Sequence, residues 1–387
     1  MKSGRPSAAA SCASIPPACR ALNGVFSCPI LGGWVGGWWR LNPKPARKRR
    51  HRMAIDVHAH HIPSSVMQRL PQEGPSCGVE IAAAGPEGPQ LRLGKGSTPG
   101  RPIISELVDL KERKKKLNEQ KLRHQLLSTW LDIVGYNLPA EQGCRWSRLL
   151  NRCLAEELKE QKPEPQFTGI ATVPLQSGER AADELEFATK ECGMVGVTIG
   201  THVNGKNLDD PSLRPFWQMA EKLKTPVIIH PFFPLGVERL GSYFLTHIVG
   251  LTAETTLAAA SLYCGGVIDQ FPDLKIVLCH GGGFFPYQVG RLDRGREIRD
   301  DIKKATRRMA REALSWFYYD TILFDPRILD FLISEAGADH VLLGSDCPFG
   351  IGDPDPTRIV QAAQLSSAER EQILTGNALK LFPIKLR

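Results

Sequence analysis

The segment "IDVHAHHIP" (55–63) places His58, His60 and His61 within four positions, after an apolar stretch and before a proline. Side chains two residues apart on a β-strand point to the same face, so His58 and His60 would face one cavity while His61 points away. Paired imidazoles of this kind bind divalent metal ions such as zinc. We therefore interpret His58 and His60 as candidate ligands and His61 as a structural residue or loop contact.

Three further polar residues follow apolar, strand-like runs, namely His230, His280 and Asp346. A single histidine at the end of a strand is more often structural than functional, but five convergent polar residues favour a site. Imidazoles combined with one carboxylate suit zinc, and manganese, iron or cobalt are possible in the same geometry. Because all five polar strand ends are present, a non-catalytic binding module is the weaker interpretation.

Eight apolar runs of strand character alternate with amphipathic segments. The runs cover residues 54–60, 124–129, 167–174, 194–200, 226–231, 275–282, 317–323 and 340–346. Near-continuous apolar strands separated by helices predict parallel strands that are buried on both faces. Eight such units predict an α/β fold, the TIM (β/α)8 barrel, whose strand ends carry the chemistry. The alternative, a doubly wound open sheet, would need a phosphate-binding glycine pattern after its first strand, and that pattern is missing.

Two segments fall outside the barrel pattern. Residues 71–102 are dense in Gly and Pro and contain two short alternating runs, which predicts a small β insertion after strand 1 that forms a hairpin or flap over the barrel mouth. Residues 1–52 contain ten Lys or Arg and no Asp or Glu. We interpret them as a basic extension that is disordered or precedes a true start at Met53, and the barrel domain as 53–387. A membrane span or a transit peptide is a weaker interpretation of 1–52.

The composition narrows the function classes further. The chain has 387 residues, 42% of them hydrophobic, and a formal net charge of +8 that is concentrated in residues 1–52. The remainder contains 39 basic and 41 acidic residues, so we expect neither nucleic-acid nor membrane binding. The ten cysteines show no C-x-x-C spacing, which favours reduced thiols in a cytoplasmic protein.

The glycine run "HGGG" (280–283) allows two other interpretations. It can be an ordinary turn in which glycine permits close backbone approach without any catalytic meaning. It can also be a phosphate cradle, but no Lys or Ser/Thr follows at the required spacing.

Taken together, the motifs resemble the amidohydrolase-related family (amidohydrolase 2) that includes the aminocarboxymuconate-semialdehyde decarboxylases. The resemblance runs from about Ile55 to about Phe382 and is carried by "HAH", "VTIGTHVNGKNLDDPSLRPFWQ", "HGGGFFPYQVGRL", "LLGSDCPF" and "GNALKLF". It implies a metal-dependent TIM barrel that removes a carboxylate as CO₂ without an organic cofactor or oxygen. Two departures, Leu122 where the family often has Gly and Cys347 in place of the usual aromatic residue, concern the substrate rather than the ligands.

The resemblance also implies a role for each site residue. It makes His280 the acid/base residue and Arg291 an arginine that reaches a neighbouring subunit's site in a homodimer. The other implied roles are metal ligation by His58, His60, His230 and Asp346, carboxylate binding by Arg101, and an aromatic pocket wall formed by Phe232. The substrate would be a small carboxylic acid, unsaturated or aromatic. A metal-dependent hydrolase or hydratase that uses the same metal and histidine stays open as the alternative function.

Overall fold

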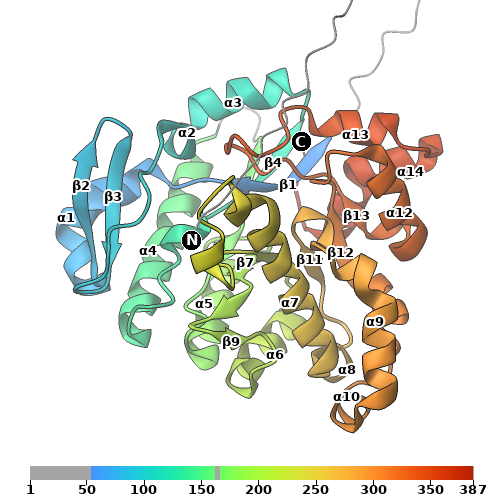
Figure 1. The fold of residues 1–387 in the computed structure, drawn as a ribbon. Coiled ribbons are helices and arrows are strands. Elements are labelled where there is room, and N and C mark those ends of the chain that lie inside the picture. Colours follow the sequence, from blue (N-terminus) through green and yellow to red (C-terminus); the bar gives the residue numbers. More distant parts are fainter. Residues whose placement is uncertain (1–53, 162–165, 387) are drawn as a thin grey trace, which may run out of the picture. The chain divides into compact units, whose positions relative to one another are not determined.

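A computed structural model describes residues 54–161 and 166–386 (Figure 1), so the predicted extension, 1–52, lies outside the described residues. The described chain contains a barrel of eight parallel strand positions. In sequence order they are β1 (Ile55–His60), β4 (His124–Ser128), β5 (Phe167–Gly169) with β6 (Ala171–Thr172), β7 (Val197–Gly200), β10 (Val227–His230), β11 (Ile276–Leu278), β12 (Phe317–Asp320) and β13 (Val341–Leu342). The eight positions fall within the eight predicted runs.

The barrel is closed by two connections between the groups of paired strands. β5 and β6 are one strand interrupted at Ile170, and β5 pairs with β4 while β6 pairs with β7. At the other side, the N–H of Val57 donates to the carbonyl of Leu343 (2.9 Å) and the N–H of Asp346 donates to the carbonyl of His58 (2.9 Å). The first strand therefore meets the segment of the last, which confirms the predicted (β/α)8 barrel.

Helices follow the barrel strands and lie around them (Figure 1). The Asp325 carboxylate begins α12 by accepting a hydrogen bond from the N–H of Arg327 (2.9 Å), a typical N-cap. Within the described residues, none of the helices combines the length and apolar character needed to cross a membrane. The barrel helices are α3 (Leu110–Glu119), α4 (Ala140–Lys159), α5 (Gly178–Lys190), α6 (Arg214–Leu223), α7 (Leu251–Cys264), α9 (Phe285–Ile298), α12 (Pro326–Ala336) and α13 (Pro356–Ala362). Shorter helices are α8 (Val267–Gln270), α10 (Asp300–Ala305), α11 (Ala310–Ala313), α14 (Ser367–Glu371) and α15 (Asn377–Leu381).

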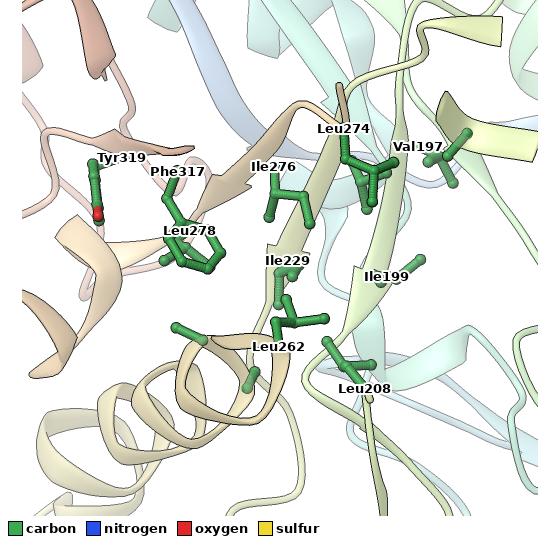
Figure 2. Close-up of a cluster of buried hydrophobic side chains, with 14 of the residues drawn as sticks. Val197, Ile199, Leu208, Ile229, Leu262, Leu274, Ile276, Leu278, Phe317 and Tyr319 are labelled. Carbon is green, nitrogen blue, oxygen red and sulfur yellow. The ribbon is translucent and has the colours of Figure 1, made fainter. Parts of the chain in front are cut away.

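Alternate strand residues pack on opposite sides of the barrel wall. Ile229 belongs to the cluster that includes Leu262 of α7 (Figure 2), so this face is turned toward the surrounding helices. Ile228 instead packs in a second cluster with Phe382 from the C-terminal segment, inside the barrel. His230, two residues after Ile228, shares the inner face. The alternation thus directs the histidine at the end of β10 into the barrel.

The segment between β1 and β4 contains α1 (Ser64–Cys77), the antiparallel hairpin of β2 (Val79–Gly85) and β3 (Gly88–Leu93), and α2 (Ser105–Val108). The predicted insertion, 71–102, therefore begins inside α1 and continues as the hairpin. Leu91 and Leu93 of the hairpin and residues 97–101 line a large cavity. The insertion thus contributes one wall of that cavity.

Candidate metal centre and substrate cavity

Four imidazoles surround one carboxylate at the end of the barrel where β1, β10, β11 and β13 finish. The Oδ1 atom of Asp346 lies 3.4 Å from Nε2 of His58, 3.1 Å from Nε2 of His60 and 3.9 Å from Nε2 of His230. The other oxygen, Oδ2, lies 3.6 Å from Nε2 of His280. The five polar strand ends predicted from the sequence therefore come together. Three of the histidines approach Oδ1 of Asp346, whereas His280 approaches Oδ2.

The spacing of these atoms fits a divalent ion. Two ligand atoms about 2.1 Å from one tetrahedral ion lie about 3.4 Å apart. The Nε2 atoms of His58 and His60 are 3.2 Å apart, close to this value, as are their distances of 3.4 and 3.1 Å to Asp346. Nε2 of His230 is buried and has no hydrogen-bond partner among the described residues. A buried nitrogen without a partner is unfavourable unless something accepts its lone pair, and a metal ion would do so.

The second nitrogen of two of these rings is fixed by a hydrogen bond. Nδ1 of His58 lies 2.7 Å from Oδ2 of Asp320, and Nδ1 of His230 lies 2.8 Å from the carbonyl oxygen of Pro231. Donation from Nδ1 leaves Nε2 with its lone pair directed into the cluster, as metal ligation requires. Asp320 also accepts the N–H of Gly281 (2.9 Å). Asp320 was not predicted, although it ends β12 and the strand-end rule would have found it.

Electrostatics favour a cation at this point. Burial alone would raise the pKa of Asp346, but hydrogen bonding to the imidazoles holds the pKa of this carboxyl well below its ordinary value. Burial lowers the pKa of His230 well below its ordinary value, although Asp346 opposes the shift, so this imidazole is neutral near pH 7. The ligand atoms of Cys279, His58 and Asp320 also lie within 4.8 Å of one another. Burial, however, raises the pKa of Cys279 to about 11 and keeps the thiol protonated. The cluster thus offers a carboxylate and, at His230, a neutral nitrogen ligand.

His280 enters the cluster through an unusual turn. β11 ends at Leu278, and the next outward position on a continued strand would be residue 280. His280 instead has φ +56, and Gly281, Gly282 and Gly283 have φ +60, +78 and +60. A Cβ at Gly283 would lie 2.1 Å from the carbonyl oxygen of Thr252. The glycines therefore permit a left-handed turn with close backbone approach, one of the two interpretations of the glycine run, and the turn brings the imidazole of His280 into the cavity.

A cavity of about 1820 Å³ opens onto this cluster. His230, His280 and Asp346 line it, together with the predicted wall residue Phe232. The Phe232 ring stacks on His202, with ring centroids 4.8 Å apart and an interplanar angle of 17°. Further aromatic residues line the cavity, namely Trp130, Tyr136, Phe233, Phe244, Phe284, Tyr287, Phe324, Phe331 and Phe349. A cavity with an apolar, aromatic wall and few polar groups suits a flat organic acid.

The two predicted arginines occupy different places. Arg101 lines the cavity and forms a bidentate ion pair with Asp132, through Nε to Oδ2 (2.6 Å) and Nη2 to Oδ1 (3.0 Å). Arg291 is exposed on α9 and does not line the cavity of its own chain. Outside the cluster, the Nε2 atom of His61 lies 2.6 Å from a carboxylate oxygen of Glu157 on α4. The structure thus brings Arg101 to the cavity and leaves Arg291 at the surface.

Comparison with known proteins identifies relatives over most of the chain. The profile of the amidohydrolase family matches residues 144–384. A 2-amino-3-carboxymuconate-6-semialdehyde decarboxylase from Dictyostelium discoideum is 36% identical over 284 residues, which cover 73% of this chain and 79% of that protein. Both findings agree with the family resemblance seen in the motifs.

Solved structures confirm the fold class. A 5-carboxyvanillate decarboxylase from Sphingomonas paucimobilis superposes with a TM-score of 0.72 and 24% identity, covering 86% of this chain and 100% of that chain. A dihydroxybenzoic acid decarboxylase from Polaromonas sp., solved with manganese and the inhibitor 2-nitroresorcinol, superposes with a TM-score of 0.69 and 26% identity. That match covers 85% of this chain and 96% of the Polaromonas chain.

Proposed function

The chain belongs to the amidohydrolase family, and we propose on this premise that it is a metal-dependent, non-oxidative decarboxylase of an unsaturated or aromatic carboxylic acid. The observation that carries the proposal is the cluster of four imidazoles around Asp346, which lies in a cavity with an aromatic wall. The relatives from Dictyostelium discoideum and Polaromonas sp. are both named as decarboxylases.

The ion would be held by His58, His60, His230 and Asp346. Distances alone do not decide whether His60 or His280 is the third histidine ligand. The ligand atoms of four residues lie within 4.8 Å of one another, and these residues are His58, His230, His280 and Asp346. The contact of His280 with the other carboxylate oxygen favours a separate role for it. Zinc suits the imidazole-rich set, and the manganese of the Polaromonas relative makes that ion the second choice. When bound, the ion supplies a Lewis acid and lowers the pKa of a coordinated water.

His280 handles the proton. In decarboxylation the bond between the substrate carbon and its carboxylate breaks, CO₂ leaves, and the electron pair stays on the substrate carbon, which must then take a proton. The side chain of His280 is 12% exposed and lines the cavity, so it can reach the reacting carbon. Its Nε2 lies 3.6 Å from Oδ2 of Asp346, a contact that orients the ring in the cavity. Phe232 and Arg101 both line the cavity, where Phe232 orients the substrate ring and Arg101 binds a substrate carboxylate.

Release of CO₂ tests the proposal. The purified, metal-loaded protein should release CO₂ from at least one acid in a panel of unsaturated and aromatic carboxylic acids, and the product should lack that carboxylate. Removal of the metal by a chelator should stop the release, and restored metal should recover it. Incorporation of ¹⁸O from labelled water into a product that keeps all its carbon atoms would instead identify the alternative hydrolase or hydratase.

We further propose that the active unit is a homodimer in which Arg291 holds the substrate carboxylate of the neighbouring subunit. Arg291 is exposed on α9 and does not reach its own cavity. Large apolar side chains near the cavity are also exposed, among them Tyr243 (88%), Leu235 (79%) and Tyr287 (78%). Exposed apolar side chains in such numbers mark surfaces that become covered on association.

Mixing of two inactive variants tests the dimer. Arg291→Ala chains exchanged with His280→Ala chains should recover about a quarter of wild-type activity, because half of the randomly paired dimers are mixed and each has one intact site. His230→Ala mixed with His280→Ala is the matched control, since both residues act in their own chain and no intact site forms. Absence of recovery with Arg291→Ala despite verified exchange would place Arg291 in its own chain or outside the reaction.

A cytoplasmic location is also proposed, since all seven cysteines in the described part of the chain are free thiols. Proteins that keep thiols unpaired in this number are typical of reducing compartments.

A further inference from the structure

Arg113 is a buried arginine on α3 whose guanidinium lies at the seam of the barrel, where β1 meets the segment after β13. The residue is 2% exposed. Its Nη2 donates to the carbonyl oxygen of His60 (2.5 Å) and to that of Glu106 (2.9 Å). Its Nη1 lies 3.4 Å from the carbonyl oxygen of Cys347. The guanidinium therefore contacts the end of the first strand and the segment that follows the last one.

Both of these backbone segments carry a proposed metal ligand. His60 is itself a proposed ligand, and Cys347 directly follows Asp346. The carbonyl oxygen of Cys347 also accepts the N–H of His60 (2.8 Å), so Arg113 binds a carbonyl on each of two segments that are already hydrogen-bonded. Asp346 has φ +59, a conformation that is unfavourable with a Cβ and that surrounding contacts must impose. Arg113 is placed to supply such a contact.

A chain of buried polar groups extends the interaction along the seam. Nη1 of Arg113 lies 3.4 Å from Oε1 of Gln125, whose Nε2 donates to Oδ2 of Asp56 (2.6 Å). Oδ1 of Asp56 accepts the N–H of His58 (3.0 Å) and the N–H of Ser345 (3.1 Å). Ser345 directly precedes the proposed aspartate ligand. The polar chain therefore reaches the backbone beside each proposed ligand on the two strands that close the barrel.

We propose that Arg113 is a positioning residue for the metal centre, which fixes the backbone of His60 and Asp346 so that their side chains meet at one ion. The inference rests on the metal site of the proposed function, but it concerns a residue that does not touch the ion. Burial of a guanidinium is unfavourable because the group loses its hydration, and the surrounding oxygens offset this cost. The planar fork of arginine suits the position, because it directs several donors at fixed angles to separate carbonyls.

Zinc affinity and protein stability, measured on the same variants of the full chain, test this role. Arg113→Met keeps an unbranched apolar side chain and removes every donor. It should weaken zinc binding about 10- to 100-fold, the range typical for loss of a contact that orients a ligand. Competition with a chelator of known affinity measures zinc binding. Denaturant unfolding of the metal-free protein measures the free energy of unfolding separately.

Cobalt(II) is a second probe, because its visible absorption depends on the number and arrangement of its ligands. The spectrum of Arg113→Met should differ from that of the wild type, since His60 and Asp346 would no longer be held in register. Arg113→Lys keeps the charge but loses the fork, so its zinc affinity should lie between those of the wild type and Arg113→Met. If Arg113→Met does not fold, wild-type affinity and spectrum in Arg113→Lys would overturn the proposal.

Arg148→Met is the matched control. Arg148 on α4 donates to the buried carboxylate of Glu184 on α5 (2.7 Å), and neither residue lines the cavity. Its loss should lower the free energy of unfolding but leave the zinc affinity and the cobalt spectrum at wild-type values. An equal loss of zinc affinity in Arg148→Met and Arg113→Met would mean that Arg113 only supports the fold.

The outcomes separate this role from the proposed function. Metal binding by the wild type with an unchanged affinity and spectrum in Arg113→Met would refute the positioning role alone. A wild-type protein that binds neither zinc nor cobalt would refute the metal site of the proposed function, and the inference with it.

Discussion

Replacement of His280 by Ala leaves the metal content of the protein unchanged and lowers kcat about 10²- to 10⁴-fold, the usual contribution of a positioned acid/base group. The reason is geometric: His280 contacts Oδ2 of Asp346, whereas His58, His60 and His230 approach Oδ1. Steady-state kinetics and metal analysis on the same sample measure both parts of the expectation.

A matched control for His280 is His340→Ala. The Nδ1 atom of His340 lies 2.9 Å from the carbonyl oxygen of Phe317, and this ring does not line the cavity. Metal content and kcat of this control should stay at wild-type values. Loss of metal from His280→Ala would instead make His280 a ligand. Its ligand atom lies within 4.8 Å of those of His58, His230 and Asp346, so the two roles must be distinguished.

His230→Ala should lose the metal under mild chelation and, with it, the decarboxylase activity. Nε2 of His230 is buried and has no hydrogen-bond partner within the described chain, and a bound metal ion would accept its lone pair. Asp320→Asn should have a smaller effect, because it leaves the four proposed ligands in place and acts on the metal through the hydrogen bond that orients His58. Loss of such a supporting contact typically weakens metal binding about 10- to 100-fold.

Competition with a metal-buffering chelator measures these affinities, and the order should be wild type, then Asp320→Asn, then His230→Ala. Asp339→Asn, an exposed carboxylate outside the cavity, serves as the control for Asp320→Asn. Full metal occupancy of His230→Ala at chelator concentrations that strip Asp320→Asn would remove His230 from the ligand set.

Much of the barrel and of the cluster could be predicted because strand periodicity is a local property. The alternation of side chains placed His58 and His60 together, and it also places His230 on the inner face with Ile228. The buried character of each run predicted parallel strands, and the order of the runs predicted the barrel. These inferences need only the residues of one element at a time.

The remaining features depend on contacts between distant segments or on local backbone conformation. The pairing of Arg101 with Asp132 joins residues 31 positions apart, and no periodic pattern connects them. His280 and Asp346 both adopt positive φ angles, +56 and +59, which are unfavourable by about 1–2 kcal/mol for residues with a Cβ. Strand alternation does not predict such conformations, since the tertiary structure imposes them.

The seam at which the barrel closes also has a consequence for biosynthesis. Asp346 contacts His60 across a separation of 286 positions in the chain, and its N–H donates to the carbonyl of His58. During translation, His58 and His60 therefore leave the ribosome long before Asp346, the last of the proposed ligands, is added. Contacts of such long range form slowly, because closing the intervening loop costs conformational entropy. The nascent polypeptide would complete its metal site only after nearly the whole barrel has emerged, so metal insertion would follow translation of β13. The bound ion would then connect β1 to the segment that follows β13 and stabilise the closed barrel.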